Sequence, residues 1–294
     1  MLVPMKEILT HAVQNHYAVG SFDVPNLETA TAVLEAAQEN VSPVVIAVPE
    51  TFFPFQQFEV FVKAIRLLAE PLDIPVALIL DHGRSYDSCM RAIHAGMTTV
   101  MFDGSDLPYD ENLAITKEIV KVAHSLGITV EAEVGHVARN GLTSEEISKL
   151  LTNPAQAAEF VNETQVDCLA VAVGTIHGKY KGEPKIHFDL LEQIQRATQI
   201  PLVLHGGSST GEENLQRAIS FGIRKINIYT DMAVAAKESV VSLLEQNDPK
   251  TRINDILIAT KQSFGQVAGY YMRLFGSAGQ AEGFPRTERK LIVK

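Results

Sequence analysis

Short apolar runs rich in β-branched residues recur along the chain, and each run ends in small or polar residues. Most are continuously apolar instead of alternating, which is typical of parallel strands buried on both faces. Eight of these runs are predicted to be strands: Tyr17–Val24, Val44–Glu50, Val76–Gly83, Thr98–Ser105, Ile128–Gly135, Asp167–Gly174, Pro201–Ser208 and Lys225–Asp231.

Helical patterns, with apolar residues at three- and four-residue spacing, separate the strands. Glycines 96, 127 and 222 stand where helix C-caps belong. The predicted helices are Met5–Gln14, which precedes the first strand, and Asn26–Asn40, Asp87–Ala95, Asn112–Leu126, Pro154–Glu163, Asp189–Thr198 and Gly211–Phe221. Residues 232–275 are expected to form a last helical layer.

This alternation of strand and helix indicates either a parallel barrel or a doubly wound sheet. Eight units within residues 17–231 favour the closed barrel. We therefore predict an α/β fold, a TIM (β/α)8 barrel with an extra N-terminal helix and a C-terminal helical layer. The chain is expected to be a single barrel domain over residues 1–294, with a loosely ordered tail from about residue 276.

Length and composition fit this picture, because 294 residues are normal for one α/β barrel. The net charge of -10 argues against nucleic acid as a partner, although backbone N–H groups can still bind a small phosphate. The start of the chain does not resemble a signal peptide, and no uninterrupted apolar run is long enough to span a membrane. The cytoplasm is therefore the expected location, with Cys89 and Cys168 as reduced, buried thiols.

Barrel enzymes carry their active sites at the carboxyl ends of the strands. His82, His177 and His205 lie at the ends of the third, sixth and seventh predicted strands, each followed by glycine, and Asp103 and Glu133 lie on the fourth and fifth. Imidazoles and carboxylates are the ligands that Zn²⁺ prefers, and three protein ligands leave a position open for substrate. The alternative is three unrelated histidines near loops. Their matching positions on one rim favour a metal site.

Small residues beside these histidines suggest a phosphate cradle, since the last two strands of a barrel commonly provide one. Their backbone N–H groups, with a threonine hydroxyl and one lysine charge, would suffice to bind a phosphate. The residues concerned are Gly178, Lys181, Gly206, Gly207, Ser208 and Thr230. The alternative is that these glycines serve only turns that need a positive φ. Beside a metal site on the same rim, phosphate binding is the favoured interpretation.

Six motifs follow one another along the chain: LDHG, DGS, EAEVG, GTIHGKYKGEP, LVLHGGSS and KINIYTD. In this order and spacing the chain resembles the class II fructose-bisphosphate/tagatose-bisphosphate aldolase family, from Tyr17 to Phe275-Gly276-Ser277. The resemblance implies a zinc-dependent aldehyde-lyase that reversibly cleaves a ketose phosphate to dihydroxyacetone phosphate and an aldehyde. It also implies a homodimer or homotetramer.

Roles for individual residues follow from the same resemblance. His82, His177 and His205 would hold the catalytic zinc, with Asp103 and Glu133 at a second or more buried position, and a monovalent cation is a further candidate cofactor. Asp81 would be the general acid–base that takes the proton from the C4 hydroxyl. The substrate would contact Gly178, Lys181, Gly206, Gly207, Ser208, Asn227, Tyr229 and Thr230. No lysine stands at the obvious Schiff-base position of the sixth strand, which disfavours a lysine-based mechanism.

Departures from the family pattern gather on the half of the site that would bind the aldehyde. They are Asp23, Pro49, Arg84, the loop His136–Gly141 without an acidic residue, Tyr229, Ala233, and Asp248-Pro249-Lys250 in place of Asp-Pro-Arg. We therefore expect a non-standard ketose 1-phosphate with an acidic or otherwise altered far end, which Arg84 and Arg139 are candidates to bind. The alternatives are fructose- or tagatose-bisphosphate aldolase proper, a metal-dependent sugar-phosphate epimerase, and a non-catalytic phosphosugar-binding barrel.

Overall fold

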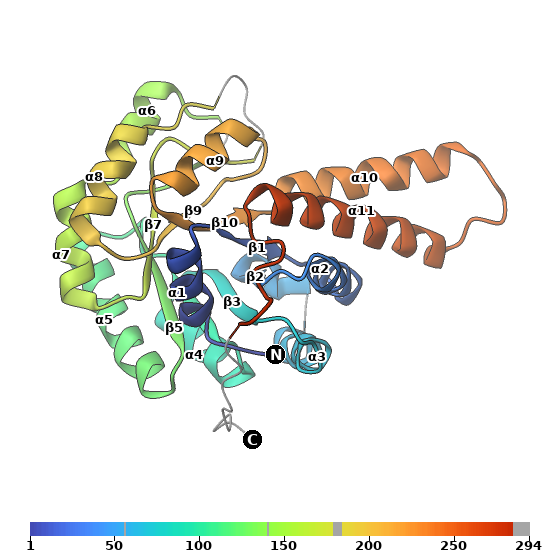
Figure 1. The fold of residues 1–294 in the computed structure, drawn as a ribbon, viewed down its shortest axis with the longest axis horizontal. Coiled ribbons are helices and arrows are strands. Elements are labelled where there is room, and N and C mark those ends of the chain that lie inside the picture. Colours follow the sequence, from blue (N-terminus) through green and yellow to red (C-terminus); the bar gives the residue numbers. More distant parts are fainter. Residues whose placement is uncertain (56, 140, 179–183, 285–294) are drawn as a thin grey trace.

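A computed structural model of the chain describes residues 1–55, 57–139, 141–178 and 184–284. Within these ranges eight parallel strands close into a barrel in the order β1-β10-β9-β7-β5-β4-β3-β2 (Figure 1). The strands are β1 (Val19–Asp23), β2 (Val44–Pro49), β3 (Val76–Gly83), β4 (Thr99–Phe102), β5 (Thr129–Val134), β7 (Cys168–Val171), β9 (Leu202–Leu204) and β10 (Ile223–Ile228). The predicted TIM barrel is confirmed, and each predicted strand overlaps an observed one.

Helices pack around the sides and the bottom of the barrel. They are α1 (Met5–Asn15), α2 (Leu27–Glu39), α3 (Phe58–Ala69), α4 (Tyr86–Ala95), α5 (Tyr109–Ser125), α6 (Ser144–Lys149), α7 (Pro154–Thr164), α8 (Phe188–Thr198), α9 (Glu212–Ser220), α10 (Thr230–Glu245) and α11 (Ile253–Leu274). Asn26 and Ser85 form capping boxes at the starts of α2 and α4, and Gly96 ends α4 in the left-handed conformation. The helices α3 and α6, the 3-10 helix η1 (Glu50–Phe55) and the short pair of β6 (Ala138–Arg139) and β8 (Ile176–His177) were not predicted.

The extra N-terminal helix closes the bottom of the barrel. Met5, Ile8 and Leu9 of α1 are buried against apolar side chains that point inward from the strands. The N–H groups of Met5 and Lys6, which have no partner within the first turn of α1, donate to the hydroxyls of Thr99 and Thr129 at 3.3 and 3.0 Å. The helix thus seals the end opposite to the predicted site.

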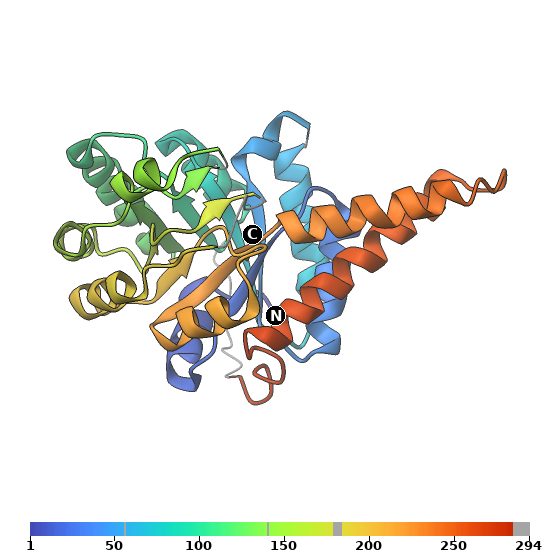
Figure 2. The same cartoon turned by 90° about the horizontal axis from the view of Figure 1, so that it is seen from above.

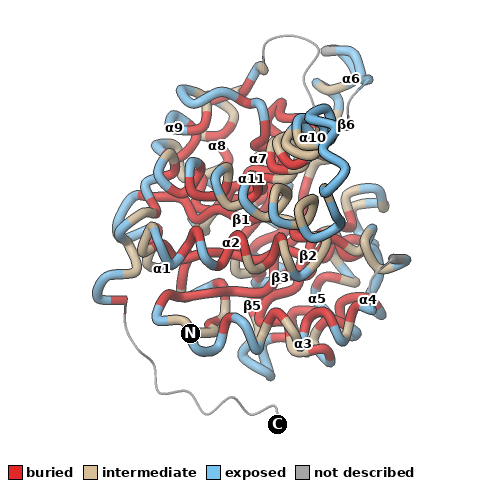
Figure 3. Tube along the Cα trace, turned by 90° about the vertical axis from the view of Figure 1, so that its right-hand side faces the viewer, coloured by how far each residue is buried: buried red, intermediate tan, exposed pale blue. Residues whose placement is uncertain are grey.

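Inward-pointing side chains divide the barrel into an apolar floor and a polar upper layer. The strands themselves are mostly buried, as Figure 3 shows. Because side chains alternate along a strand, Val203 of β9 faces the floor and His205, just beyond β9, faces the upper layer. In the upper layer Glu131, Lys225 and His205 have no exposed surface at all. Charged groups buried this completely need partners, so this layer must be hydrogen-bonded.

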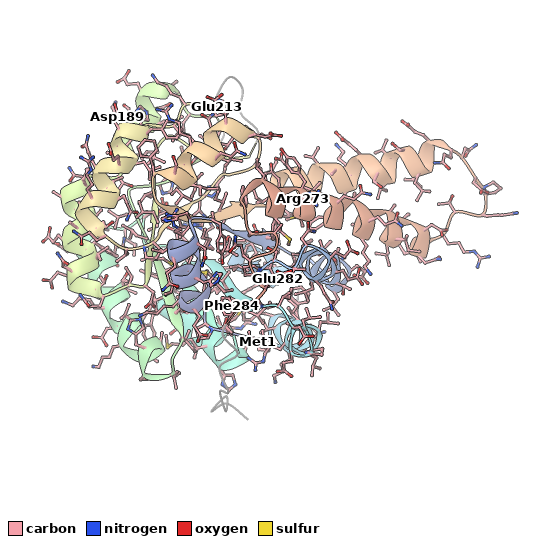
Figure 4. The ribbon with its side chains drawn as sticks, in the orientation of Figure 1. Met1, Asp189, Glu213, Arg273, Glu282 and Phe284 are labelled. Carbon is pink, nitrogen blue, oxygen red and sulfur yellow. The ribbon has the colours of Figure 1, made fainter. Side chains whose placement is uncertain are left out.

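The segment after α11 departs from prediction. Residues 277–284 are not loosely ordered, so the predicted tail from about residue 276 is wrong over this stretch. Ser277 is fully buried and its Oγ lies 2.8 Å from Ser42 Oγ, while Gly279 N–H donates to Asn40 O at 2.9 Å. The ring centroids of Phe284, which is labelled in Figure 4, and of His11 on α1 lie 5.1 Å apart. The hydrophobic pattern of this small and polar segment gives no sign of these backbone contacts.

The last two helices form a hairpin that projects from the barrel (Figure 2). Four aliphatic side chains on it are exposed: Val241, Leu244, Ile253 and Ile258. The helix α10 begins at the rim of the barrel, and its 16 residues carry the chain about 24 Å away from it. Among the described residues no helix is both long and apolar enough to cross a membrane.

Candidate active site

The end of β3 brings two neighbouring side chains to the same place. In a regular strand Asp81 and His82 would point to opposite faces. Here the pairing of β3 with β4 shifts between Leu80 and Gly83, and His82 adopts a left-handed φ of 48°. Such a conformation costs free energy in a residue other than glycine and is found mainly at functional sites. The irregularity lets both side chains reach the carboxyl end of the barrel.

Three histidines meet at this end, as predicted from the sequence. One ligand nitrogen from each of His82, His177 and His205 lies within 4.8 Å of the others. The Nε2 of His205 lies 3.0 Å from Glu131 Oε1 and must donate to it, because a carboxylate only accepts. Its Nδ1 is buried and has no hydrogen-bond partner among the described residues. An unprotonated nitrogen that faces two other imidazoles fits a metal ion.

A second group shares His82 with the first. His82, Asp103 and Glu133 also present ligand atoms within 4.8 Å of one another. The Nδ1 of His82 donates to Asp103 Oδ2 at 2.7 Å. Glu133 accepts from the N–H of Val137 at 2.9 Å through Oε1, whereas its Oε2 is buried without a partner in the described part of the chain. The five predicted ligands therefore form two adjoining groups of three.

The electrostatics of the site favour a bound cation. Burial lowers the pKa of His177 to about 3 and that of His205 well below its usual value, so both imidazoles are neutral ligands. Burial also lowers the pKa of His82, but the charges of Asp81 and Asp103 outweigh it and raise that pKa to about 10. Burial and the charge of Asp103 raise the pKa of Glu133 to about 8. Negative charge is thus in excess here, and the donor set suits a divalent ion such as Zn²⁺.

Asp81 is held firmly beside this cluster. The residue is 2% exposed, and its Oδ1 accepts a hydrogen bond from Asn227 Nδ2 at 2.9 Å. Its Oδ2 lies 4.0 Å from His82 Nε2. A carboxylate fixed through one oxygen, with the other directed at the metal cluster, is suited to accept a proton from a substrate bound there.

A cavity of about 210 Å³ opens above Asp81 and the histidines. Its lining includes six of the predicted substrate contacts: Gly178, Gly206, Ser208, Asn227, Tyr229 and Thr230. Gly207 is not part of the lining, and its N–H donates to Asn227 O at 3.2 Å. Lys181 lies outside the described residues. A second cavity of about 480 Å³ shares His82 and His177 with the first and extends towards Arg84 and His136.

One side of the first cavity contains the start of a helix. Thr230 is the first residue of α10 and lines the cavity, so the N-terminal end of that helix, where N–H groups can bind an anion, lies beside it. Ser208 Oγ accepts from the N–H of Asp231 at 3.3 Å, which anchors the preceding loop to the helix. At Gly206, with φ of 68°, a Cβ would stand 2.3 Å from Ile176 O, so only glycine fits.

The remaining lining residues of this cavity, which together we call the far side, are Asp23, Pro49, Thr51, Phe52 and Tyr229. The Oδ1 of Asp23 is buried without a hydrogen-bond partner among the described residues. Burial and the charge of Asp81 raise the pKa of Asp23 well above its usual value. The rings of Tyr229 and Phe52 meet edge to face at 5.6 Å. No lysine or arginine belongs to the described lining.

Arg84, a candidate for binding an acidic substrate group, is already paired. Its Nη1 lies 2.8 Å from Asp106 Oδ2, and its Nη2 lies 3.5 Å from Asp103 Oδ2. The side chain of Arg139 lies outside the described part of the chain. His136 occupies the loop that lacks an acidic residue, and its Nδ1 lies 2.8 Å from Ser105 Oγ.

Two polar residues of the interior, Glu131 and Lys225, were not singled out from the sequence. Both are fully buried and form an ion pair with a distance of 2.9 Å between Nζ and Oε2. The sequence did contain a signal for them. Glu131 lies two positions before Glu133, and Lys225 two positions before Asn227, so each points to the same face of its strand as a predicted site residue.

Comparisons with known proteins agree with this site. The sequence model of the family described as "Fructose-bisphosphate aldolase class-II" matches residues 3–280. The fructose-bisphosphate aldolase of Geobacillus stearothermophilus is 43% identical over 95% of this chain and 99% of its own. The probable fructose-bisphosphate aldolase of Bacillus subtilis (strain 168) is 40% identical with the same coverage. The crystal structure of the YdjI aldolase from Escherichia coli K12 has a TM-score of 0.85 at 36% identity and covers 96% of this chain and 100% of its own.

The chain belongs to the class II fructose-bisphosphate aldolase family and is a lyase of the aldehyde-lyase type. Members of this family are generally zinc-dependent. The predicted resemblance is thereby confirmed.

Proposed function

We propose that this protein is a zinc-dependent aldolase that reversibly cleaves a ketose 1-phosphate into dihydroxyacetone phosphate and an aldehyde whose far end is not a phosphate. The observation that carries the reaction is the cluster of His82, His177 and His205, with the unpartnered Nδ1 of His205 facing it. The observation that carries the substrate is the lining of the far side.

In the proposed mechanism these three histidines hold the zinc, and Asp103 and Glu133 provide a second position for it. A bound zinc ion supplies Lewis-acid stabilisation of the negative charge that develops on the substrate oxygens. Asp81 takes the proton of the C4 hydroxyl, and the freed electron pair forms the aldehyde carbonyl. The C3–C4 bond breaks as this carbonyl forms, its electrons remain on the dihydroxyacetone phosphate half, and C3 of that half then takes a proton from water.

The phosphate of that half would lie against Gly178, Gly206, Ser208 and Thr230. Backbone N–H groups at the start of α10 can bind it without a lysine, which suits an acidic protein. Asn227 lines the same cavity, but its amide is already bonded to Asp81. We therefore propose that Asn227 supports Asp81 and does not primarily bind the phosphate.

The far side argues against a second phosphate. Asp23 is acidic, Pro49 has no N–H to donate, and Tyr229 offers one hydroxyl. Two carboxyl groups close together cannot both ionise freely, so a phosphate beside Asp23 and Asp81 would meet repulsion. A protonated or hydrogen-bonded Asp23 would instead bind substrate hydroxyls. Arg84, on the neighbouring cavity, is the candidate for a carboxylate, provided that it leaves Asp106.

We further propose a homodimer built on the α10–α11 hairpin. Exposed apolar residues on the hairpin are typical of a surface that is buried in a protein–protein interface. The tip of the hairpin, which contains Lys250, lies about 24 Å along α10 from the cavity of its own subunit. Lys250 could reach an active site only in a second copy of the chain. Sedimentation of the purified protein tests this, and a monomer at micromolar concentration would contradict it.

The experiment for the function is a panel of phosphorylated ketoses, scored by released triose phosphate in the presence of zinc and after treatment with a chelator. The panel contains bisphosphates and 1-phosphates ending in a hydroxyl or a carboxylate. We expect chelator-sensitive cleavage with the highest kcat/KM for a 1-phosphate. An isomer of unchanged mass in place of triose phosphate would instead indicate an epimerase. Binding without turnover would indicate a phosphosugar-binding barrel.

A further inference from the structure

A chain of five buried side chains crosses the upper layer of the barrel beneath the cavity. Asn227 Nδ2 donates to Asp81 Oδ1 at 2.9 Å, and Lys225 Nζ donates to Asn227 Oδ1 at 2.8 Å. Lys225 Nζ also lies 3.1 and 2.9 Å from the two oxygens of Glu131. The chain ends at His205, whose Nε2 lies 3.0 Å from Glu131 Oε1. The predicted general base and one predicted metal ligand are therefore joined by hydrogen bonds.

Lys225 and Glu131, at the centre of this series of hydrogen bonds, determine which group donates and which accepts in each of them. An ammonium group only donates and a carboxylate only accepts. Lys225 therefore orients the amide of Asn227 so that its oxygen faces the lysine and its NH₂ group faces Asp81. Glu131 in the same way requires the proton of His205 on Nε2, which leaves the lone pair of Nδ1 towards the histidine cluster.

The charged state of Lys225 is secure in this environment. Burial alone would lower its pKa, but the charges of Glu131 and Asp81 outweigh burial and raise it above the usual value. Neither Lys225 nor Glu131 belongs to the described lining of the two cavities at this end of the barrel. Both act on the site only through the residues that they hold.

We propose that the buried pair Lys225–Glu131 is a positioning device that sets the hydrogen-bond direction at both the general base and a metal ligand. Glu131 fixes the tautomer of His205 that can bind zinc, and Lys225 fixes the amide of Asn227 that holds Asp81. This inference rests on the proposed function, which assigns His205 to zinc and Asp81 to proton transfer. An ion pair with a purely structural role would affect only the stability of the fold. It would not determine which ring nitrogen of His205 is free to bind a metal.

Glu131→Gln tests the arm that leads to the metal. Glutamine has nearly the same volume, and with its oxygen in the place of Oε2, the closer of the two to Lys225 Nζ, its NH₂ group takes the place of Oε1 and faces His205 Nε2. The proton of His205 then moves to Nδ1, and the lone pair that faces the cluster is lost. We expect a zinc affinity about 10- to 100-fold lower in competition with a chromophoric chelator. Nitrogen NMR of the metal-free protein should show the tautomer of His205 reversed.

Cys168→Ala is the matched control, because Cys168 Sγ lies 3.8 Å from Glu131 Oε2, whereas His205 contacts Oε1. This substitution disturbs the same region of the core but leaves every donor and acceptor of the hydrogen-bonded chain in place. We expect unchanged zinc affinity and an unchanged His205 tautomer. Reversal of the tautomer by Cys168→Ala as well would contradict the assignment to Glu131.

A double variant, Lys225→Met with Glu131→Leu, separates positioning from stability. Replacing both members of a buried ion pair by apolar residues is often neutral for folding or stabilising. We expect a folded protein with an unchanged or higher Tm that has weaker zinc affinity and a lower kcat. If Glu131→Gln or the folded double variant bound zinc as tightly as the wild type, the positioning role would be refuted. If the wild type itself bound no zinc, the proposed function would fail instead.

Discussion

The near side of the cavity, defined by the three histidines, Asp81 and the start of α10, differs in construction from the far side. On the near side His205 and Asp81 are tied through Asn227, Lys225 and Glu131 into one hydrogen-bonded chain. On the far side Asp23 has a buried oxygen without a partner in the described part of the chain, and Pro49 cannot donate. The near side needs only a cation to be complete, whereas the far side needs a substrate group to pair with Asp23.

This difference indicates where the reaction and its specificity reside. Atoms fixed by several bonds cannot change without loss of every reaction that depends on them. The far side carries no such network in the described residues, so its residues can differ among relatives that share the chemistry. We therefore expect changes on the near side to abolish turnover of every substrate, and changes on the far side to alter which substrate is preferred.

Removal of the metal should have the largest effect. A chelator that strips the histidine cluster takes away the Lewis acid, and cleavage of every ketose phosphate should fall to background. Stoichiometric zinc should restore it. The measurement is triose phosphate release before and after each step, with bound zinc quantified in parallel. Full activity in a protein shown to be free of metal would contradict the claim that cleavage needs a metal ion held by the three histidines.

Loss of the base should come next. Asp81→Ala removes the only proton acceptor that we assign to the C4 hydroxyl, and kcat should fall by about 10²- to 10⁴-fold. Zinc content should stay the same, because Asp81 is not among the predicted ligands. The same fall is expected for all cleaved substrates. A variant that kept kcat within a few-fold of the wild type would show that another group takes the proton.

A smaller effect with the opposite sign is expected on the far side. Asp23→Asn replaces a carboxyl group that can ionise by an amide that cannot, so no negative charge can develop beside the substrate at this position. The kcat/KM for fructose 1,6-bisphosphate should rise about tenfold, which corresponds to about 1.4 kcal/mol. That for a 1-phosphate ending in a hydroxyl should stay the same or fall. Equal changes in kcat/KM for both substrates would contradict the claim that the far side determines which substrate is preferred.

The same substitution should have a smaller effect on stability. Burial raises the pKa of Asp23 in the folded protein above the usual value of 3.8. Between these two pKa values the folded protein holds more protons than the unfolded chain, so the wild type loses stability as pH rises from about 4 towards the raised pKa. The asparagine of the Asp23→Asn variant does not titrate, so the variant lacks this loss.

The urea unfolding free energy of the metal-free proteins checks this point. The difference in favour of Asp23→Asn should widen with rising pH, by at most about 1.4 kcal/mol per pH unit. Titrations shared by both proteins cancel in this difference. If the unfolding free energies of the two proteins changed in parallel above pH 4, the pKa of Asp23 would not be raised in the folded protein.

Much of the fold was predictable because burial on both faces leaves a continuous apolar signal in each strand. The errors have physical causes as well. The amphipathic helix α3 follows β2 after only a 3-10 turn, and it was missed although its Phe58, Phe61, Val62 and Ile65 lie at helical spacing. The segment 277–284 is held by backbone hydrogen bonds to residues just after α2, which no side-chain pattern reveals.

The metal cluster was predictable because parallel strands align their carboxyl ends, so His82, His177 and His205 had to converge. The support beneath it was not, since it depends on which inward positions of β5 and β10 face each other across the barrel. The pairing of Glu131 with Lys225 is fixed by strand order and stagger, which the sequence does not display.

The central claim is that an intact zinc and proton-transfer side serves a substrate without a second phosphate. The most direct test is the ratio of kcat/KM for fructose 1-phosphate to that for fructose 1,6-bisphosphate, measured on the zinc-loaded wild type by release of dihydroxyacetone phosphate. We predict a ratio above one. A ratio well below one, with kcat/KM for the bisphosphate at or above about 10⁴ M⁻¹s⁻¹, would contradict the account.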